Sequence, residues 1–167
     1  ELRNEQSMTD NEYTGDYQTQ QIPLRYVPVE ELTRITRQLL RQTALTNDDA
    51  DIIADALITS ELRNLQGQGQ GVRRVSAYID RLANGYLDPT APFEIVKESP
   101  ALALIDAHNA PGTVVAVKSM RLAVEKAKTC GVGMVVVRHS THFGSASYSA
   151  SQALSVLLAE VAPPKRA

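Results

Sequence analysis

Apolar residues recur every three or four positions in three segments of the first half of the chain, which predicts three amphipathic helices. The first follows Pro28, a residue suited to an opening helical turn. The second begins at Thr46, which is placed to cap it, and ends near Arg63. The third begins at Val72 and closes at a C-cap formed by Asn84-Gly85.

The second half of the chain adds strands to this helical region. Short strands are predicted over residues 93–97 and 101–106, on either side of a turn. The apolar run over residues 132–137 is continuous rather than alternating, which is typical of a strand buried on both faces. The sequence therefore predicts an α/β fold, in which strands follow a helical N-terminal region.

Two further helices are predicted around the third strand. One runs from Pro111-Gly112 to Gly131, and the other from Ala146 to about Leu158. Between the strand and the last helix lies a loop over residues 138–145. Ligands of α/β folds tend to bind beyond the carboxyl ends of strands, so this loop is the expected position of a site.

Composition limits the possible functions of the chain. Its 167 residues are 43% hydrophobic and 22% charged, as in one soluble globular domain. A net charge of −2 without basic clusters argues against nucleic-acid or membrane-surface binding, and no apolar run is long enough for a transmembrane helix. Cys130 is the only cysteine, and no secretory signal is visible, so we expect a cytoplasmic protein.

The two ends of the chain differ from its middle. Residues 1–26 are polar and lack an apolar period, so we expect a flexible tail before a domain over 27–160. The chain begins at Glu1 and ends with a proline-rich segment over 161–167 that follows an apolar helix. Both features are consistent with a fragment or an altered terminus.

His142 is the first candidate for chemistry. It follows the predicted third strand, precedes Phe143-Gly144, and lies just before a helix N-terminus. This position offers a titratable group, an apolar wall and nearby amide donors. A structural or solvated histidine is the alternative. His139 is also near, but the loop contains no cysteine or carboxylate to complete a zinc site, so we expect no metal.

Arg74 and Tyr78 form the second candidate. Residues four apart share a helix face, so a guanidinium fork and a phenol could together bind a carboxylate. A solvated arginine beside a half-buried tyrosine is the alternative. The preceding run Gln66–Gly71 alternates glutamine and glycine, but it follows a helix and lacks the lysine of a phosphate-binding loop, which favours a simple connector.

Together these residues resemble one family. The chain from about Val27 to Leu154 is similar to the type-2 malate/L-lactate dehydrogenases, which include ureidoglycolate and sulfolactate dehydrogenases, diketogulonate reductases and cyclic-imine reductases. The matching motifs are Glu61-Leu62-Arg63, Gly71-Val72-Arg73-Arg74, Tyr78-Ile79-Asp80-Arg81-Leu82, Ala103-Leu104-Ile105-Asp106 with Asn109 and Gly112, Gly131-Val132-Gly133, and His142-Phe143-Gly144 with Tyr148.

The resemblance implies a fold, a reaction and partners. The fold would be the family's own α/β arrangement, in which a helical N-terminal region is followed by a partial mixed sheet. It would not be a Rossmann domain, in agreement with the absence of a dinucleotide fingerprint. The enzyme would move hydride between NAD or NADP and a small 2-hydroxy or 2-oxo acid such as malate, lactate or ureidoglycolate, and would work as a homodimer. Family chains are about twice as long, on the scale of domain sizes. The fold would therefore be truncated here, with most cofactor-binding residues beyond the end of this chain.

The resemblance also assigns roles to single residues. His142 would be the catalytic acid/base, Arg74 would bind the substrate carboxylate, and Tyr78 would help to shape that pocket. Gln70 replaces the histidine of the family's Ser-His-Gly pattern. A glutamine cannot exchange a proton near neutral pH, but it can hydrogen-bond a substrate oxygen. Two alternatives to the dehydrogenase remain: a catalytically incompetent fragment, and a carboxylate-binding module without redox activity.

Overall fold

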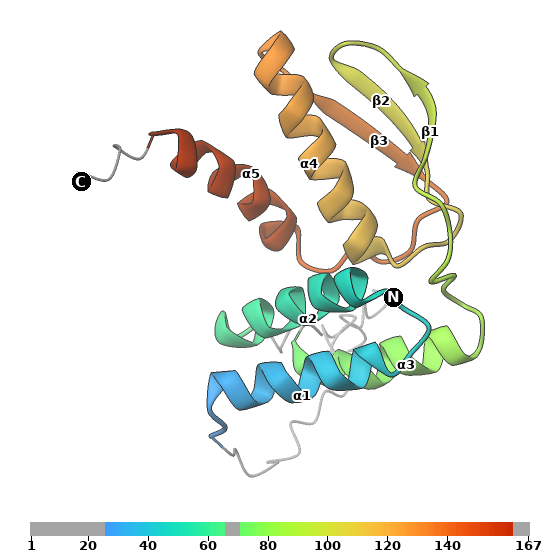
Figure 1. Ribbon diagram of the computed structural model, residues 1–167, viewed down its shortest axis with the longest axis vertical. Coiled ribbons are helices and arrows are strands. Elements are labelled where there is room, and N and C mark those ends of the chain that lie inside the picture. Colours follow the sequence, from blue (N-terminus) through green and yellow to red (C-terminus); the bar gives the residue numbers. More distant parts are fainter. Residues whose placement is uncertain (1–25, 66–70, 162–167) are drawn as a thin grey trace, which may run out of the picture.

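A computed structural model of the chain describes residues 26–65 and 71–161, with residues 155–161 as helical backbone alone. Most of the tail expected over 1–26, the segment expected over 161–167, and Gln70 lie outside the described residues. The described part has two neighbouring regions. A group of three helices lies at one end, and a small sheet with a long helix across it lies at the other (Figure 1).

The helical group contains the three helices that the sequence predicts. They are α1 (Val29–Arg41), α2 (Asn47–Leu62) and α3 (Val75–Ala83), and one turn of 3₁₀-helix over Val72–Arg74 leads into α3. Thr46 caps α2 as expected, because its hydroxyl accepts a hydrogen bond from the backbone N–H of Asp49 at 3.1 Å. The three helix predictions are confirmed, with boundaries that differ by a few residues at most.

The core lies where α2 packs against its neighbours. Several small residues on α2, among them Ala50 and Ala54, are fully buried, so adjacent helices can approach closely. One continuous cluster of buried side chains joins α1, α2, α3 and α4, and its members are Leu40, Leu45, Ala50, Ile53, Ala54, Leu57, Val75, Tyr78, Leu87 and Val114. This shared core fixes α3 relative to α4, and the candidate site depends on both helices.

The sheet has three strands and is mixed, as the family resemblance implies. Its strands β1 (Glu94–Glu98), β2 (Leu102–Asp106) and β3 (Met134–Arg138) lie in the order β1-β2-β3. The β1 strand is antiparallel to β2, whereas β3 is parallel to β2. The long helix α4 (Gly112–Cys130) connects β2 to β3, and α5 (Ala146–Val161) follows β3. Figure 1 shows α4 lying across one face of the sheet.

The prediction that the apolar run over 132–137 is buried on both faces is wrong for the described residues. Met134 is 53% exposed and Val136 is 46% exposed. The physical reason is the position of β3 at the end of the sheet, with α4 covering only the face that Val135 and Val137 share. Leu102 and Leu104 of β2 lie with Met134 and Val136 along a shallow apolar groove on the open face.

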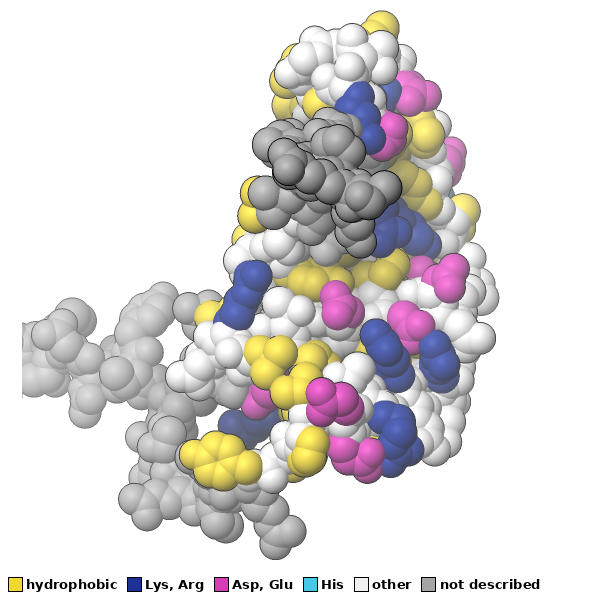
Figure 2. Space-filling view, turned by 60° about the vertical axis from the view of Figure 1, so that its left-hand side comes forward, with side chains coloured by type: hydrophobic (Ala, Val, Ile, Leu, Met, Phe, Trp, Pro, Cys, Tyr) yellow, Lys and Arg dark blue, Asp and Glu magenta, His cyan; other side chains and the backbone are white. Residues whose placement is uncertain are grey.

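The surface is mixed in charge. In the face that Figure 2 displays, basic and acidic side chains are interspersed with apolar ones, and no field of a single sign is visible. This agrees with the net charge of −2. Within the described ranges, no helix combines the length and the apolar content that a membrane span requires.

The α2 core makes a first prediction. Ile53 is fully buried, so replacing it with Ala should lower the free energy of unfolding by about 2–5 kcal/mol through lost burial and the cavity left behind. The matched control is Leu62→Ala at the end of the same helix. Leu62 is 62% exposed, so this change should cost no more than about 0.5 kcal/mol. Urea denaturation measures both, and equal losses would contradict the assigned core.

Candidate active site

The loop that carries His142 begins where β2 and β3 end together. Asp106, the last residue of β2, is buried, and its carboxylate accepts hydrogen bonds from three residues that lie close to it. These donors are Nε of Arg138 at 2.8 Å, Nδ1 of His139 at 2.9 Å and the backbone N–H of His108 at 3.0 Å. The carboxylate therefore ties the start of the loop to the sheet.

The surroundings of Asp106 favour the ionised form of its carboxyl group. Burial alone would raise the pKa of its carboxyl group, because burial penalises the charged form. The hydrogen bonds from His108, His139 and Arg138 outweigh burial and lower the pKa to about 2. His139, which the sequence placed near the candidate site, thus hydrogen-bonds to Asp106.

The middle of the loop rests on the first turn of α4. The Thr141 hydroxyl accepts a hydrogen bond from the backbone N–H of Gly112 at 2.8 Å and donates one to the carbonyl of Ala110 at 3.2 Å. This approach is so close that a Cβ atom on Gly112 would lie 2.2 Å from the carbonyl oxygen of Thr141. Only a glycine fits at this position, and no local pattern in the sequence indicated this steric requirement at Gly112.

His142 lies at the rim of a narrow cleft between this loop and α3. Its Nδ1 accepts a hydrogen bond from the backbone N–H of Gly144 at 3.1 Å, which leaves Nε2 for a ligand. The ring of Phe143 lies nearly parallel to the imidazole, with 6.2 Å between the ring centroids. Phe143 is itself about half exposed, so the apolar wall expected there is incomplete.

The cleft brings together three of the four site residues that the sequence predicts. His142 from the loop meets Arg74 and Tyr78 from the start of α3, although 64 positions separate His142 from Tyr78. Gln70 lies outside the described residues. The remaining lining residues are Ala77, Arg81, Leu87 and Thr141. The space inside is about 10 Å³, which is room for about one water molecule, so the arginine side chains must move to admit an acid.

The cleft is electropositive. Partial burial, followed by the positive charges of Arg74 and Arg81, lowers the pKa of His142 below its ordinary value. Burial raises the pKa of Tyr78, although its hydrogen bond with Thr113 and the two arginines act in the other direction. The buried hydroxyl of Tyr78 is hydrogen-bonded to the hydroxyl of Thr113 of α4, 2.7 Å away. This bond fixes the Tyr78 side chain in the wall of the cleft.

Arg81 and Thr113 are site residues that sequence reasoning missed. Arg81 could have been found from spacing, because residues 74, 78 and 81 are separated by four and three positions and share one helix face. Thr113 carried no such signal, since its contact with Tyr78 joins residues 35 positions apart. The packing of α4 against α3 creates that contact.

A second cleft lies on the other side of the same loop, between α4, β3 and the start of α5. Its volume is about 510 Å³, and most of its wall is apolar or small, including Ala116, Met120 and Phe143. Two hydroxyl groups on this wall, those of Ser119 and Ser149, are buried and have no hydrogen-bond partner among the described residues. Such groups are costly unless they bind a ligand or water.

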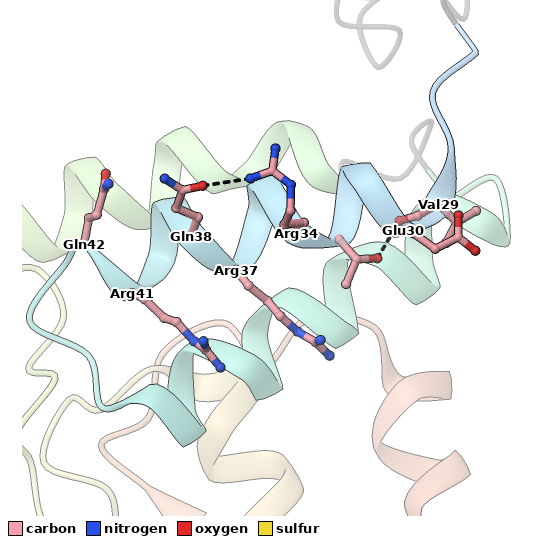
Figure 3. Close-up of a pocket in the computed structure, with 8 residues that line it drawn as sticks. Val29, Glu30, Arg34, Arg37, Gln38, Arg41 and Gln42 are labelled. Carbon is pink, nitrogen blue, oxygen red and sulfur yellow. Dashed lines mark hydrogen bonds between the residues drawn. The ribbon is translucent and has the colours of Figure 1, made fainter.

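A groove along α1 is larger, and two of its three arginines are held in short ion pairs within the protein. Figure 3 shows Arg34, Arg37 and Arg41 projecting from this helix, together with Gln38 and Gln42. Arg34 pairs with Glu31 at 2.6 Å, and Arg41 pairs with Asp51 at 2.7 Å. Because Arg34 and Arg41 are paired within the protein, and no described histidine lines the groove, it is a weaker candidate than the His142 cleft.

Among the side chains that the structure describes, those of residues 26–65 and 71–154, there is no group of three or more His, Cys, Asp or Glu that could hold a metal ion. His108, which bonds to Glu94 and lies near Asp106, belongs to the ion pairs of the sheet edge.

Comparison with known proteins identifies the family. A model of the malate/L-lactate dehydrogenases matches residues 27–158. The chain belongs to this family. Malate dehydrogenase from Pyrococcus abyssi is 37% identical over 127 residues, which cover 76% of this chain and 34% of the relative. L-sulfolactate dehydrogenase from Methanocaldococcus jannaschii is 37% identical over 126 residues, which cover 75% of this chain and 36% of the relative.

The fold prediction is confirmed by solved structures of this family. Malate dehydrogenase from Pyrococcus horikoshii OT3 superimposes with a TM-score of 0.75 at 34% identity, covering 79% of this chain and 37% of that one.

A more distant curated relative is ureidoglycolate dehydrogenase (NAD(+)) from Escherichia coli. It is 29% identical, and the match covers 74% of this chain and 35% of the relative. The chain thus matches about a third of the length of these curated relatives.

The contact at Gly112 makes a second prediction. Gly112→Ala should push the loop off α4, change the NMR signals of the His142 ring, and cost about 1–3 kcal/mol through overpacking. Gly85→Ala is the control. Gly85 has a φ of +71° but no atom within 4 Å of an added Cβ, so the variant should lose about 1 kcal/mol with the His142 signals unchanged. Unchanged His142 signals in Gly112→Ala would refute the contact.

The pKa of Asp106 makes a third prediction. Its folded-state pKa of about 2 lies below the unfolded value of about 3.9, so the carboxylate stabilises the fold above about pH 4, and this stabilisation is lost as the pH falls towards 2. Asp106→Asn should therefore flatten the dependence of the urea midpoint on pH in this window. Asp80→Asn, at an exposed position, should keep the wild-type slope. An Asp106→Asn slope equal to that of the wild type would refute the assignment.

Proposed function

We propose that the protein is a nicotinamide-dependent oxidoreductase, or the part of one that holds the substrate and the proton-transfer group, acting on a small 2-hydroxy or 2-oxo acid. The observation that carries this proposal is the meeting of Arg74 and His142 in one electropositive cleft. One side chain offers a planar fork for a carboxylate, and the other can exchange a proton near neutral pH. Membership of a dehydrogenase family supports the reaction class.

Each site residue that the sequence predicts has a role in this proposal. Arg74 binds the carboxylate next to the reacting carbon, and Tyr78, held by Thr113, shapes the wall behind it. His142 exchanges the proton of the substrate oxygen at Nε2, because its Nδ1 faces the Gly144 amide. Gln70 hydrogen-bonds a substrate oxygen, in keeping with its amide chemistry and its position in the resemblance.

The second cleft suits the nicotinamide end of the cofactor. Its apolar wall can pack against a flat ring, and the buried hydroxyls of Ser119 and Ser149 can hydrogen-bond a carboxamide. Thr141 lines both clefts, so a ring in the second cleft would lie next to an acid in the first. When bound, the nicotinamide supplies or accepts the hydride at the carbon that bears the substrate oxygen.

Finer assignments follow the relatives. Malate, L-sulfolactate and ureidoglycolate, the acids for which the relatives are named, are the substrate candidates, with lactate as a fourth. Both NAD and NADP are candidate cofactors, and one relative is named for NAD⁺. A homodimer in the cytoplasm is the proposed form of the complete enzyme.

Turnover kinetics test the role of His142. In the purified 167-residue chain, His142→Ala should lower kcat for oxo-acid reduction by about 10²–10⁴-fold, the usual contribution of a general acid or base, with little change in KM. Arg74→Gln should mainly raise KM. The change in nicotinamide absorbance at each 2-oxo acid concentration gives both constants, and an unchanged kcat in His142→Ala would remove this residue from the mechanism.

Cofactor binding separates the proposal from its alternatives. Titration of the chain with NADH and with NADPH should give micromolar binding of at least one of them. Absence of binding would favour the incompetent fragment. Acid binding without any substrate-dependent change in nicotinamide absorbance would favour the carboxylate-binding module, which the Arg74–Tyr78 face supports equally well.

A further inference from the structure

Thr113 connects helix α3 to the loop that carries His142. It is the second residue of α4 and is buried, with 2% of its surface exposed. Its hydroxyl oxygen, Oγ1, shares a hydrogen bond with the Tyr78 hydroxyl at 2.7 Å. The three atoms nearest to a Cβ added at Gly144 all belong to the Thr113 side chain, and Oγ1 is the closest at 3.0 Å. One oxygen atom of α4 therefore lies between α3 and the loop.

Gly144 in turn orients the ring of His142. Its backbone N–H donates a hydrogen bond to Nδ1 of that ring at 3.1 Å. The φ of Gly144 is +80°, in the left-handed region that glycine adopts without steric cost. A neutral imidazole carries one proton, and Nδ1 is an acceptor here, so that proton lies on Nε2. The Gly144 amide therefore selects one tautomer of His142.

The first turn of α4 also holds the backbone of His142 itself. A Cβ atom on Gly112 would lie 2.7 Å from the carbonyl oxygen of His142, so the two backbone segments are in direct contact. Gly112 and Thr113 thus meet the loop at two places, one at His142 and one at Gly144. Gly112 contributes the absence of a side chain, whereas Thr113 contributes a hydroxyl group that has a partner on α3.

We propose that Thr113 is a positioning residue for His142: its hydroxyl, held by Tyr78, keeps the Gly144 amide against Nδ1, so that Nε2 presents its proton to a substrate oxygen. The inference rests on the proposed function, in which His142 acts on the substrate oxygen through Nε2. Thr113 lines neither of the two clefts beside the loop, so it acts through its neighbours and not on the substrate.

The test removes the hydroxyl and keeps the shape of the side chain. Thr113→Val puts a methyl group in place of Oγ1, and NMR of the ¹⁵N-labelled 167-residue chain reports which nitrogen of the His142 ring carries the proton. At a pH of about 8, above the ordinary histidine pKa of about 6.5, the wild-type proton should lie on Nε2 alone. In Thr113→Val both tautomers should be populated. Exchange of the Gly144 amide with solvent should become about two- to tenfold faster, the effect of losing one ordinary hydrogen bond.

Turnover separates positioning from a purely structural effect. Thr113→Val should lower kcat for 2-oxo acid reduction by about two- to tenfold, with a smaller change in KM because Arg74 is unaltered. Thr113→Ser keeps the hydroxyl group and should restore both the Nε2 tautomer and the kcat of the wild type.

Thr36→Val is the matched control. Thr36 is also buried, with 3% of its surface exposed, but it lies on α1 and outside both clefts. The same chemical change at this position should leave the His142 tautomer and kcat unchanged. A Thr113→Val variant with the wild-type tautomer and wild-type exchange of the Gly144 amide would overturn the inference. So would a Thr113→Ser variant that resembles Thr113→Val, because the hydroxyl would then not be the cause.

A pair of alanine substitutions tests the contact between Thr113 and Gly144. Gly144→Ala alone places its Cβ 3.0 Å from Oγ1, so it should displace the Gly144 amide from the His142 ring. Thr113→Ala removes the obstructing oxygen. The urea midpoint of the double variant should therefore fall by less than the sum of the two single losses, because substitutions at residues in contact are not additive. Additive losses would contradict the inference.

These outcomes differ from a failure of the proposed function, because the NMR measurements need neither a nicotinamide nor an acid. A His142 tautomer that depends on Thr113, in a chain that never reduces a 2-oxo acid, would refute the oxidoreductase and support the link between Thr113 and the His142 ring. An active chain in which Thr113→Val changes the tautomer but not kcat would refute the positioning role alone.

Discussion

The close contact between Gly112 and the carbonyl of Thr141 is the constraint on which the candidate site depends. It sets the loop after β3 directly on the first turn of α4, at a distance that any side chain at position 112 would prevent. Because α4 shares a buried core with α2 and α3, the loop is thereby placed relative to the arginines of α3. The Asp106 carboxylate holds the start of the loop to the sheet, so the loop is fixed from two sides.

The candidate site is distinguished by its charged and titratable side chains rather than by the size of its cavity. The cleft has almost no free volume, but it gathers two guanidinium groups beside one imidazole. Partial burial, followed by the charges of these two groups, lowers the pKa of His142 below its ordinary value, so the ring favours its neutral form. The neighbouring cleft has the opposite character, with an apolar wall and two unpartnered hydroxyls. Thr141 lines both, so the two kinds of environment meet at one loop.

Local patterns predicted the elements well because each depends on nearby residues. The capping hydroxyl of Thr46, the helical spacing around Tyr78 and the placement of the loop after β3 were all visible in the sequence. Contacts between distant segments were not. The burial of β3 was misjudged because exposure depends on which elements cover a strand, and Met134 and Val136 face an open side. The roles of Gly112 and Thr113 were missed for the same reason, since both depend on the packing of α4.

The central claim is that a 2-oxo acid held in this cleft receives hydride from a nicotinamide and a proton from His142. Isotope transfer tests it most directly: the chain is incubated with NADH or NADPH deuterated at the transferring position of C4 and with a mono- or dianionic 2-oxo acid. The account predicts a hydroxy acid with one deuterium on its second carbon, and its loss in His142→Ala. A product that lacks deuterium, or one formed equally well by His142→Ala, would contradict the account.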